Sequence, residues 1–103
     1  MADPMRIRAQ LKGDVTEVRV LMAHDMETGQ RKDSAGNVIP ALHIQSVTAT
    51  WNGKPVLSAQ FGPAVSQNPV MNFSFKGGAK GDKVIVSWTD NKGEKRTDEA
   101  LIS

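Results

Sequence analysis

Apolar and polar residues alternate along most of this chain, and an alternation with a period of two predicts β-strands rather than helices. The first alternating stretches span residues 5–11 and 18–22, on either side of Gly13 and Asp14, so they form a predicted hairpin. Further predicted strands span residues 43–51, 54–61, 71–75 and 84–88, and the polar tail at 94–103 suits an edge strand.

Turn residues separate these stretches and indicate how the strands connect. Asn52 and Gly53 supply the positive φ angles of a type I′ turn, which predicts a second hairpin around them. Two prolines exclude a continuous strand ladder over residues 62–69, so this segment is interpreted as a crossing connection. Glycine-rich turns are predicted at residues 77–82 and 90–93.

About seven short strands, with no helical periodicity, predict an all-β fold of the immunoglobulin-like antiparallel β-sandwich type. A chain of 103 residues has the size of one domain, so residues 1–103 are expected to form a single β-sandwich domain. Trp51 and Trp88 are expected on opposite strands of its core.

A long polar segment, His24 to Pro40, interrupts this series of short turns. Loops longer than about 12 residues are uncommon in compact domains and tend to be functional or disordered. A loop this polar on a small strand-rich scaffold predicts a working surface. Met26 is its apolar exception, and we expect it either to anchor the loop to the body or to insert into a partner.

Composition and charge narrow the possible partners. The hydrophobic content of 39% and the charged content of 23% are typical of globular proteins, and the net charge is +2. Arg6, Arg8 and Arg19 alternate with apolar neighbours, as expected of a solvated sheet face. With three Phe, two Trp and no Tyr, the chain is poorly supplied for stacking on bases, so nucleic-acid binding is not predicted.

The chain contains no cysteine, which excludes disulfides and thiolate catalysis within it. No apolar run approaches the roughly 18 residues of a membrane helix, and the first ten residues lack the apolar core of a signal peptide. The sequence therefore predicts a protein without a membrane segment that would need help, or a removed leader, to be exported.

A metal site is the sharpest chemical hypothesis that the residues offer. His24, Asp25 and Glu27 lie together at the start of the long loop, with Met22 and Met26 close by, and thioether and imidazole ligands suit copper. The competing interpretation is that Met22 continues an apolar strand face and that the others are ordinary loop residues. A small copper carrier is accordingly the alternative function.

Two other features have simpler interpretations. His43 could serve as a general base, but no partner lies at a revealing spacing and no nucleophile turn is present, so a structural or surface histidine is favoured. The glycine-rich segment at residues 77–82 looks like a phosphate loop, yet a predicted strand follows it where a phosphate loop precedes a helix. A β-turn is therefore predicted there.

Four segments of the chain form a recognisable combination. They are HDMETGQRKD at 24–33, IPA at 39–41, FGPAVSQNP at 61–69 and DNKG at 90–93. Together they resemble SoxZ, the small subunit of the SoxYZ sulfur-carrier complex of bacterial thiosulfate oxidation, and the resemblance covers essentially the whole chain. Two places depart from the family pattern, Asp25 and the Leu42-His43-Ile44 run, so no role for His43 follows from it.

The resemblance implies a non-catalytic, periplasmic subunit, without cofactor or metal, that pairs with SoxY as a heterodimer. SoxY carries the sulfur on a cysteine near its C-terminus, and other Sox enzymes would contact the pair transiently. Family members lack their own export signal and are thought to be exported with SoxY. Isolated from SoxY, the chain is expected to expose an apolar patch and to be prone to self-association. The residues predicted to bind the partner are Met26, Thr28, Gly29 and Arg31 in the long loop, and Phe61, Val65, Ser66 and Asn68 in the connection.

Overall fold

The computed structural model describes residues 3–24, 26–27, 29–62, 65 and 67–103. These residues form seven strands, and no helix among them is long and apolar enough to cross a membrane. The strands are β1 (Arg6–Lys12), β2 (Val15–Leu21), β3 (Ile44–Trp51), β4 (Lys54–Gln60), β5 (Val70–Lys76), β6 (Lys83–Asp90) and β7 (Lys95–Leu101).

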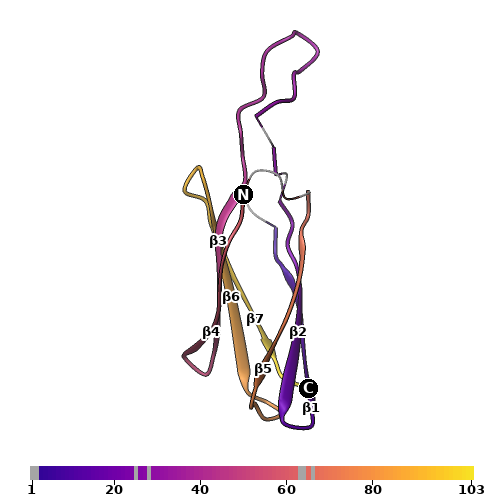
Figure 1. Cartoon of the computed structure of the whole chain (residues 1–103), viewed down its shortest axis with the longest axis vertical. Coiled ribbons are helices and arrows are strands. Elements are labelled where there is room, and N and C mark those ends of the chain that lie inside the picture. The colour runs from indigo at the N-terminus through magenta and orange to yellow at the C-terminus, as the bar shows by residue number, and fades with distance from the viewer. Residues whose placement is uncertain (1–2, 25, 28, 63–64, 66) are drawn as a thin grey trace.

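The strands form two antiparallel sheets that face each other (Figure 1). One sheet has three strands in the order β1-β2-β5, and the other has four in the order β4-β3-β6-β7. The predicted all-β, immunoglobulin-like antiparallel sandwich is confirmed, and β7 is the edge strand that the polar tail predicted.

The predicted turns are confirmed by the backbone. Asn52 and Gly53 both have positive φ, 47° and 84°, as a type I′ hairpin requires. Gly13 and Asp14 join β1 to β2 directly. In the glycine-rich segment, the N–H of Asp82 donates to the carbonyl of Ala79 at 3.0 Å, so this segment is a turn between the sheets.

The core lies between the sheets and follows the alternation in the sequence. Trp88 is 1% exposed and is the largest fully buried side chain. The prediction for the two tryptophans was wrong in one respect, since β3 and β6 are neighbours in one sheet. Trp51 lies near the other end of that sheet, where its ring centroid is 5.2 Å from that of Phe75.

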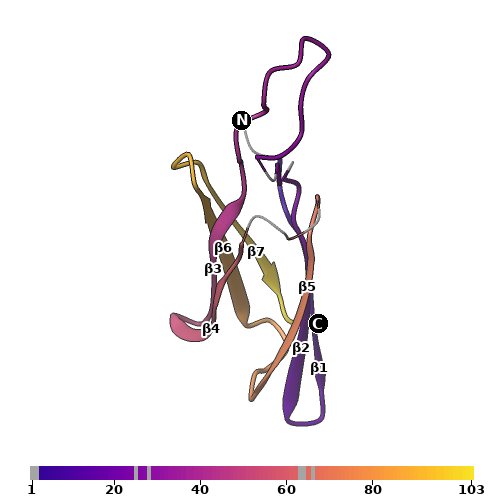
Figure 2. The same ribbon diagram turned by 45° about the horizontal axis from the view of Figure 1, so that its top comes forward.

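The long polar segment folds back on itself and forms a ribbon held by isolated bridges rather than by strands. We call residues 26–42 the arm; it projects beyond the sheets at one end of the molecule (Figures 1 and 2). Isolated bridges pair Glu27 with Leu42 and Lys32 with Val38, and the Asp33 carboxylate accepts the N–H of Ala35 at its tip.

The arm makes the molecule long, 54 Å against 19 and 18 Å across. The radius of gyration of the whole molecule, 15.5 Å, exceeds the roughly 13 Å expected for a compact domain of this length. The extension presents a polar surface well away from the core.

Candidate partner-binding surface

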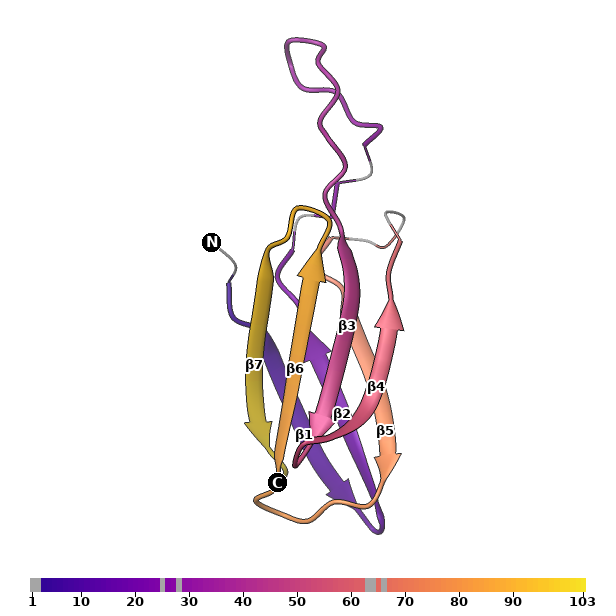
Figure 3. The ribbon, with the colours of Figure 1, turned by 90° about the vertical axis from the view of Figure 1, so that its left-hand side faces the viewer.

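The two lateral sides of the sandwich are built differently. On one side β1 and β7 come together and the chain closes the core itself (Figure 3). The N–H of Leu11 donates to the carbonyl of Ser103 and the N–H of Ser103 donates to that of Ala9, both at 3.0 Å. Ile102, between them, is 2% exposed. We call this the closed side.

The other lateral side is formed by β4 and β5, which no strand pairing joins within the described ranges (Figure 3). We call it the open side. The apolar side chains that line it pack against the core but stay partly exposed, and no third layer from the described residues covers them. They are Val56, Leu57 and Phe61 from β4 and its end, Val65 from the crossing segment, and Met71, Phe73 and Phe75 from β5.

A buried histidine joins the two sheets at the base of the arm. His24 Nε2 lies 3.1 Å from Asp90 Oδ2, and both side chains are almost fully buried. Because His24 Nδ1 accepts the N–H of Met26 at 3.1 Å, Nε2 carries the ring proton and donates it to Asp90. The His24 ring also meets the Trp88 ring edge-on, with centroids 5.1 Å apart.

Asp90 is held as a carboxylate despite its burial. Its Oδ1 accepts the N–H groups of Lys92 at 3.0 Å and Glu94 at 2.9 Å. Burial alone raises the pKa of Asp90, but the hydrogen bonds from His24, Glu94 and Lys92 outweigh it and the pKa lies below its ordinary value. The pair therefore ties the end of β2 to the end of β6.

Two asparagines hold the ends of the arm through the backbone of the two histidines. Asn68 accepts the His24 N–H through its side chain at 3.0 Å and donates its own N–H to the His24 carbonyl at 2.9 Å. Asn91 holds His43 in the same way, at 2.9 and 3.0 Å. Sequence reasoning predicted Asn68 as a partner contact and missed this structural role. Asn68 has a φ of 51°, which asparagine tolerates better than most residues.

Met26 is buried at the base of the arm. It is 5% exposed, and its sulfur accepts the N–H of Ile44 at 3.3 Å. Of its two predicted roles, the structure therefore describes the anchor to the body. Little of its side chain remains for a partner to contact, and its role in partner binding stays a prediction.

The predicted contacts on the arm have structural partners of their own. A Cβ on Gly29 would lie 3.2 Å from Ala41 Cβ, so glycine lets the two halves of the arm approach. Arg31 donates two hydrogen bonds to Glu27, and these lower the pKa of that carboxyl group. The Arg31 side chain is still 67% exposed. Thr28 lies outside the described residues.

The structure brings Phe61, Val65 and Asn68 to the same end of the sandwich as the arm base. Phe61 and Val65 belong to the open side, and the N–H of Phe61 donates to the Gln45 carbonyl at 2.9 Å. Ser66 lies outside the described residues. Sequence reasoning missed the open-side residues on β5, although their alternation marked them as core.

The described residues of the copper alternative do not gather into a metal-binding cluster. Across the described ranges, no three His, Asp or Glu side chains gather in a metal-binding arrangement. Both ring nitrogens of His24 already hold hydrogen bonds, and Met22 is 2% exposed in the core. Asp25 lies outside the described residues.

Solved structures share this fold at low sequence identity. A hypothetical protein from Pyrococcus horikoshii OT3 is 18% identical, with a TM-score of 0.69, over 99% of this chain and 89% of that one. A superoxide reductase in the oxidised state is 15% identical, with a TM-score of 0.65 and the same coverage. The superoxide reductase (neelaredoxin) from Ignicoccus hospitalis is 15% identical, with a TM-score of 0.62, over 99% of this chain and 80% of that one. At these identities the likeness shows the fold alone.

No curated protein matches the chain. The sequence pattern of one protein family, described as sulphur oxidation protein SoxZ, matches residues 5–101. That match covers nearly the whole chain and spans the arm and all seven strands. The chain therefore belongs to the SoxZ family, and its role lies in sulfur oxidation.

Proposed function

We propose that this chain is the non-catalytic subunit of a SoxYZ-type heterodimer and that its SoxY-type partner covers the open side. The partner carries the sulfur, and this chain supplies shape and a binding surface. The observation that supports the proposal is the row of partly exposed apolar side chains, including Phe61, Phe73 and Phe75, along a side that the described residues leave uncovered.

The open side has the chemistry of a stable interface. Interface centres are apolar and rich in aromatic residues and methionine, and the open side offers three Phe and Met71. Strands β4 and β5 are also sheet edges with free backbone groups, which a partner strand can pair with. A stable heterodimer should bury more than about 1,200 Å² in total.

The arm has a different part in the proposal. It is polar and projects beyond the sheets, so it is suited to transient contacts with the enzymes that act on the loaded carrier (Figure 2). Arg31 is the candidate contact there, because its exposed guanidinium remains near the surface while it pairs with Glu27. Thr28 and Gly29 belong to the same predicted surface.

The proposed location is the periplasm, with export in the company of a partner that carries the signal. This proposal follows from what membership of the SoxZ family implies. An export assay of a tagged chain, with and without the co-expressed partner, tests it. Periplasmic recovery without the partner would contradict co-export.

Co-expression with the SoxY-type subunit tests the interface. The double variant Phe61→Ser, Val65→Ser removes two apolar side chains from the arm end of the open side, and loss of apolar anchor residues weakens complexes by about 30-fold or more. The matched control is Leu101→Ser, an equally apolar residue that is 61% exposed on β7. We expect co-purification to be lost in the first variant and kept in the second.

Thermal unfolding of each isolated variant separates a binding defect from misfolding. Undiminished affinity in the folded double variant would remove the open side from the interface. Covalently bound sulfur or turnover on the isolated chain would contradict the non-catalytic role as a whole.

A further inference from the structure

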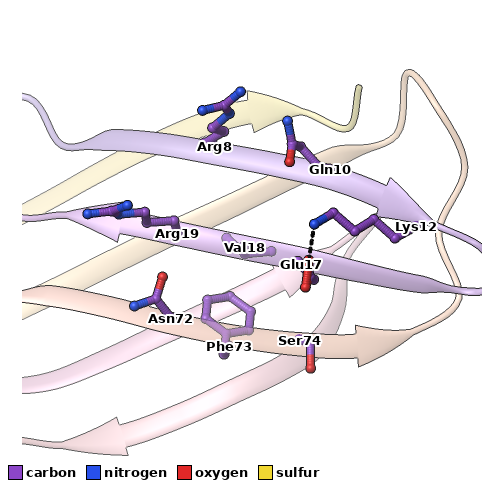
Figure 4. A pocket seen from close by; sticks show the side chains of 9 residues that line it. All are labelled: Arg8, Gln10, Lys12, Glu17, Val18, Arg19, Asn72, Phe73 and Ser74. Carbon is purple, nitrogen blue, oxygen red and sulfur yellow. Dashed lines mark ion pairs between the residues drawn. The ribbon is translucent and has the colours of Figure 1, made fainter.

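The outer face of the three-stranded sheet carries an excess of positive charge. Alternate residues of β1, β2 and β5 point away from the core on this face. The one outward carboxylate among them, Glu17, pairs with Lys12 at 2.8 Å (Figure 4). The outward cations are Arg6, Arg8, Lys12, Arg19 and Lys76.

Two arginines on this face stand directly opposite each other. Arg8 pairs in register with Arg19, and Arg19 pairs with Asn72, so one row across the sheet consists of two guanidinium groups and an amide (Figure 4). Like charges opposite each other destabilise a sheet. No carboxylate within the described part of the chain pairs with either arginine; Arg8 has only the Gln10 amide oxygen, which accepts at 3.1 Å when turned toward it.

An apolar pair lies in the next row of the same face. Leu21 and Val70 are paired in register and are 39% and 48% exposed. Arg6 is the third member of this row, opposite Leu21. An exposed apolar pair beside arginines has the composition of a protein interface, where Arg is enriched among apolar contacts.

The outer face of the four-stranded sheet shows that this excess is not general. There Ser87 and Thr97 bond to each other at 2.9 Å across β6 and β7. Lys83 pairs with Glu99 at 3.3 Å. Lys95 is a further cation of that face, but it lies opposite Thr89. Lys83 lies opposite Leu101, so neither of these two lysines faces another cation. The arginine row of the other face sets two cations opposite each other without a carboxylate from the described part of the chain.

We propose that the outer face of the β1-β2-β5 sheet is a docking surface for an acidic protein segment. A carboxylate of the segment lies over Arg8 and Arg19, and an apolar side chain beside it rests on Leu21 and Val70. This surface is separate from the open side, so it stays accessible when a SoxY-type subunit covers the open side as proposed above.

The geometry suits carboxylates on a protein chain. Residues opposite each other in an antiparallel pair are about 5 Å apart at Cα, so one carboxylate can accept from both guanidinium groups. A shallow depression of about 520 Å³ beside the arginines, bordered by Glu17, Asn72 and Ser74, gives room for side chains of the segment. Phe73 is the aromatic residue that lines this depression, and its position in the alternation of β5 belongs to the core side of the sheet. The outward positions of β1, β2 and β5 hold no ring on which successive bases could stack, which favours a protein over a nucleic acid.

Titration of the full chain, labelled with ¹⁵N, with a short glutamate-rich peptide that has one central leucine tests the proposal. We expect shifts of the amide signals of Arg8, Arg19, Leu21 and Asn72, and affinity that falls with salt. The double variant Arg8→Gln, Arg19→Gln should bind at least tenfold more weakly, because it loses charge-assisted hydrogen bonds. Its melting temperature should not fall, since the variant removes a like-charge pair.

Two controls test whether binding depends on these particular arginines and on the negative charge of the peptide. The double variant Lys92→Gln, Lys95→Gln also removes two positive charges, but from the β6–β7 turn and β7. It should bind the peptide as tightly as the unchanged chain does. A peptide with glutamine in place of glutamate should not bind. Repeating the titration on the co-purified heterodimer should give the same shifts, because the open side is a separate surface.

Several results would overturn the proposal. These are equal affinity in the double arginine variant, shifts confined to the arm or to β4, and loss of binding in the heterodimer. Tighter binding of a polyphosphate chain than of the peptide would assign the face to another polyanion. Sedimentation that shows a dimer abolished by the arginine variant would assign it to a second copy of this chain.

Discussion

The closed side and the open side of the sandwich bury apolar residues of the same strand pattern to different extents. On the closed side, Ile102 is 2% exposed because the backbone of residues 102–103 pairs with β1 and covers the core. On the open side, Phe73 and Phe75 alternate in the same way but remain partly exposed. The difference teaches that a sheet can carry a complete core pattern and still leave part of that pattern exposed at an unpaired edge.

The largest effect on stability is expected from a substitution on the closed side. Ile102→Ala removes a buried side chain from the residue that completes the core and should lower the free energy of unfolding by about 3 kcal/mol. Urea unfolding of the isolated chain measures it. The neighbour Leu101 is 61% exposed, so Leu101→Ala should change stability by less than about 0.5 kcal/mol. Equal losses in both variants would show that the closed side does not seal the core.

The second largest effect on stability is expected at the His24–Asp90 pair, which joins the two sheets at the arm base. In Asp90→Asn, an amide N–H faces the His24 Nε2–H, and two donors then point at each other. If His24 changes to the other tautomer to avoid this, its Nδ1–H faces the Met26 N–H instead. One buried polar group is then unpaired in either case, at a cost of about 2 kcal/mol. Urea unfolding, with hydrogen exchange of the Met26 amide, measures it.

The control for this prediction is Glu99→Gln, the same chemical change at a side chain that is 57% exposed. It should change stability by less than about 0.5 kcal/mol. Undiminished stability of Asp90→Asn, with unchanged hydrogen exchange of the Met26 amide, would show that the His24–Asp90 pair contributes little to the stability of the fold.

Most of the fold could be predicted from the sequence because its signals are local. Strand alternation and the Asn52-Gly53 turn depend on residues close together in the chain. The arm was predicted only as a long loop, since its ribbon depends on a turn at Asp33 and on weak pairing between residues of no particular strand preference. The His24–Asp90 pair joins residues 66 apart, and no spacing in the sequence marks it.

The candidate site was harder to predict for a related reason. The pattern that places Phe73 inward is the same whether its own chain or a partner covers it. Loop position drew attention to Met26 and Asn68, both of which the structure uses to fasten the arm. The open side became visible only when β4 and β5 were found to be unpaired edges within the described ranges.

Methionine methyl groups offer a direct comparison of the two sides. Met71 is on the open side, whereas Met5 is 6% exposed beside β7 and Met22 is 2% exposed. A soluble paramagnetic probe should therefore broaden the methyl signal of Met71 more than the other two. Binding of the SoxY-type partner should protect Met71 and leave Met5 unchanged. Equal broadening of Met71 with and without the partner would place the interface elsewhere.

The smallest effect is a pH dependence of the closed side. The hydrogen bonds from Arg96 hold the pKa of Asp98 below its ordinary value; burial opposes this, and the N–H of Met5, which donates to Asp98 at 2.9 Å, adds to it. A depressed pKa in the folded state means that the stabilisation is fully present above the ordinary carboxyl range, near pH 4, and is lost as the pH falls through the folded value. Hydrogen exchange of the Met5 amide should then accelerate in acid relative to that of open-side amides. In Asp98→Asn the Met5 amide should already exchange faster at neutral pH, and an unchanged rate would mean that the strand pairing alone holds the N-terminus in place.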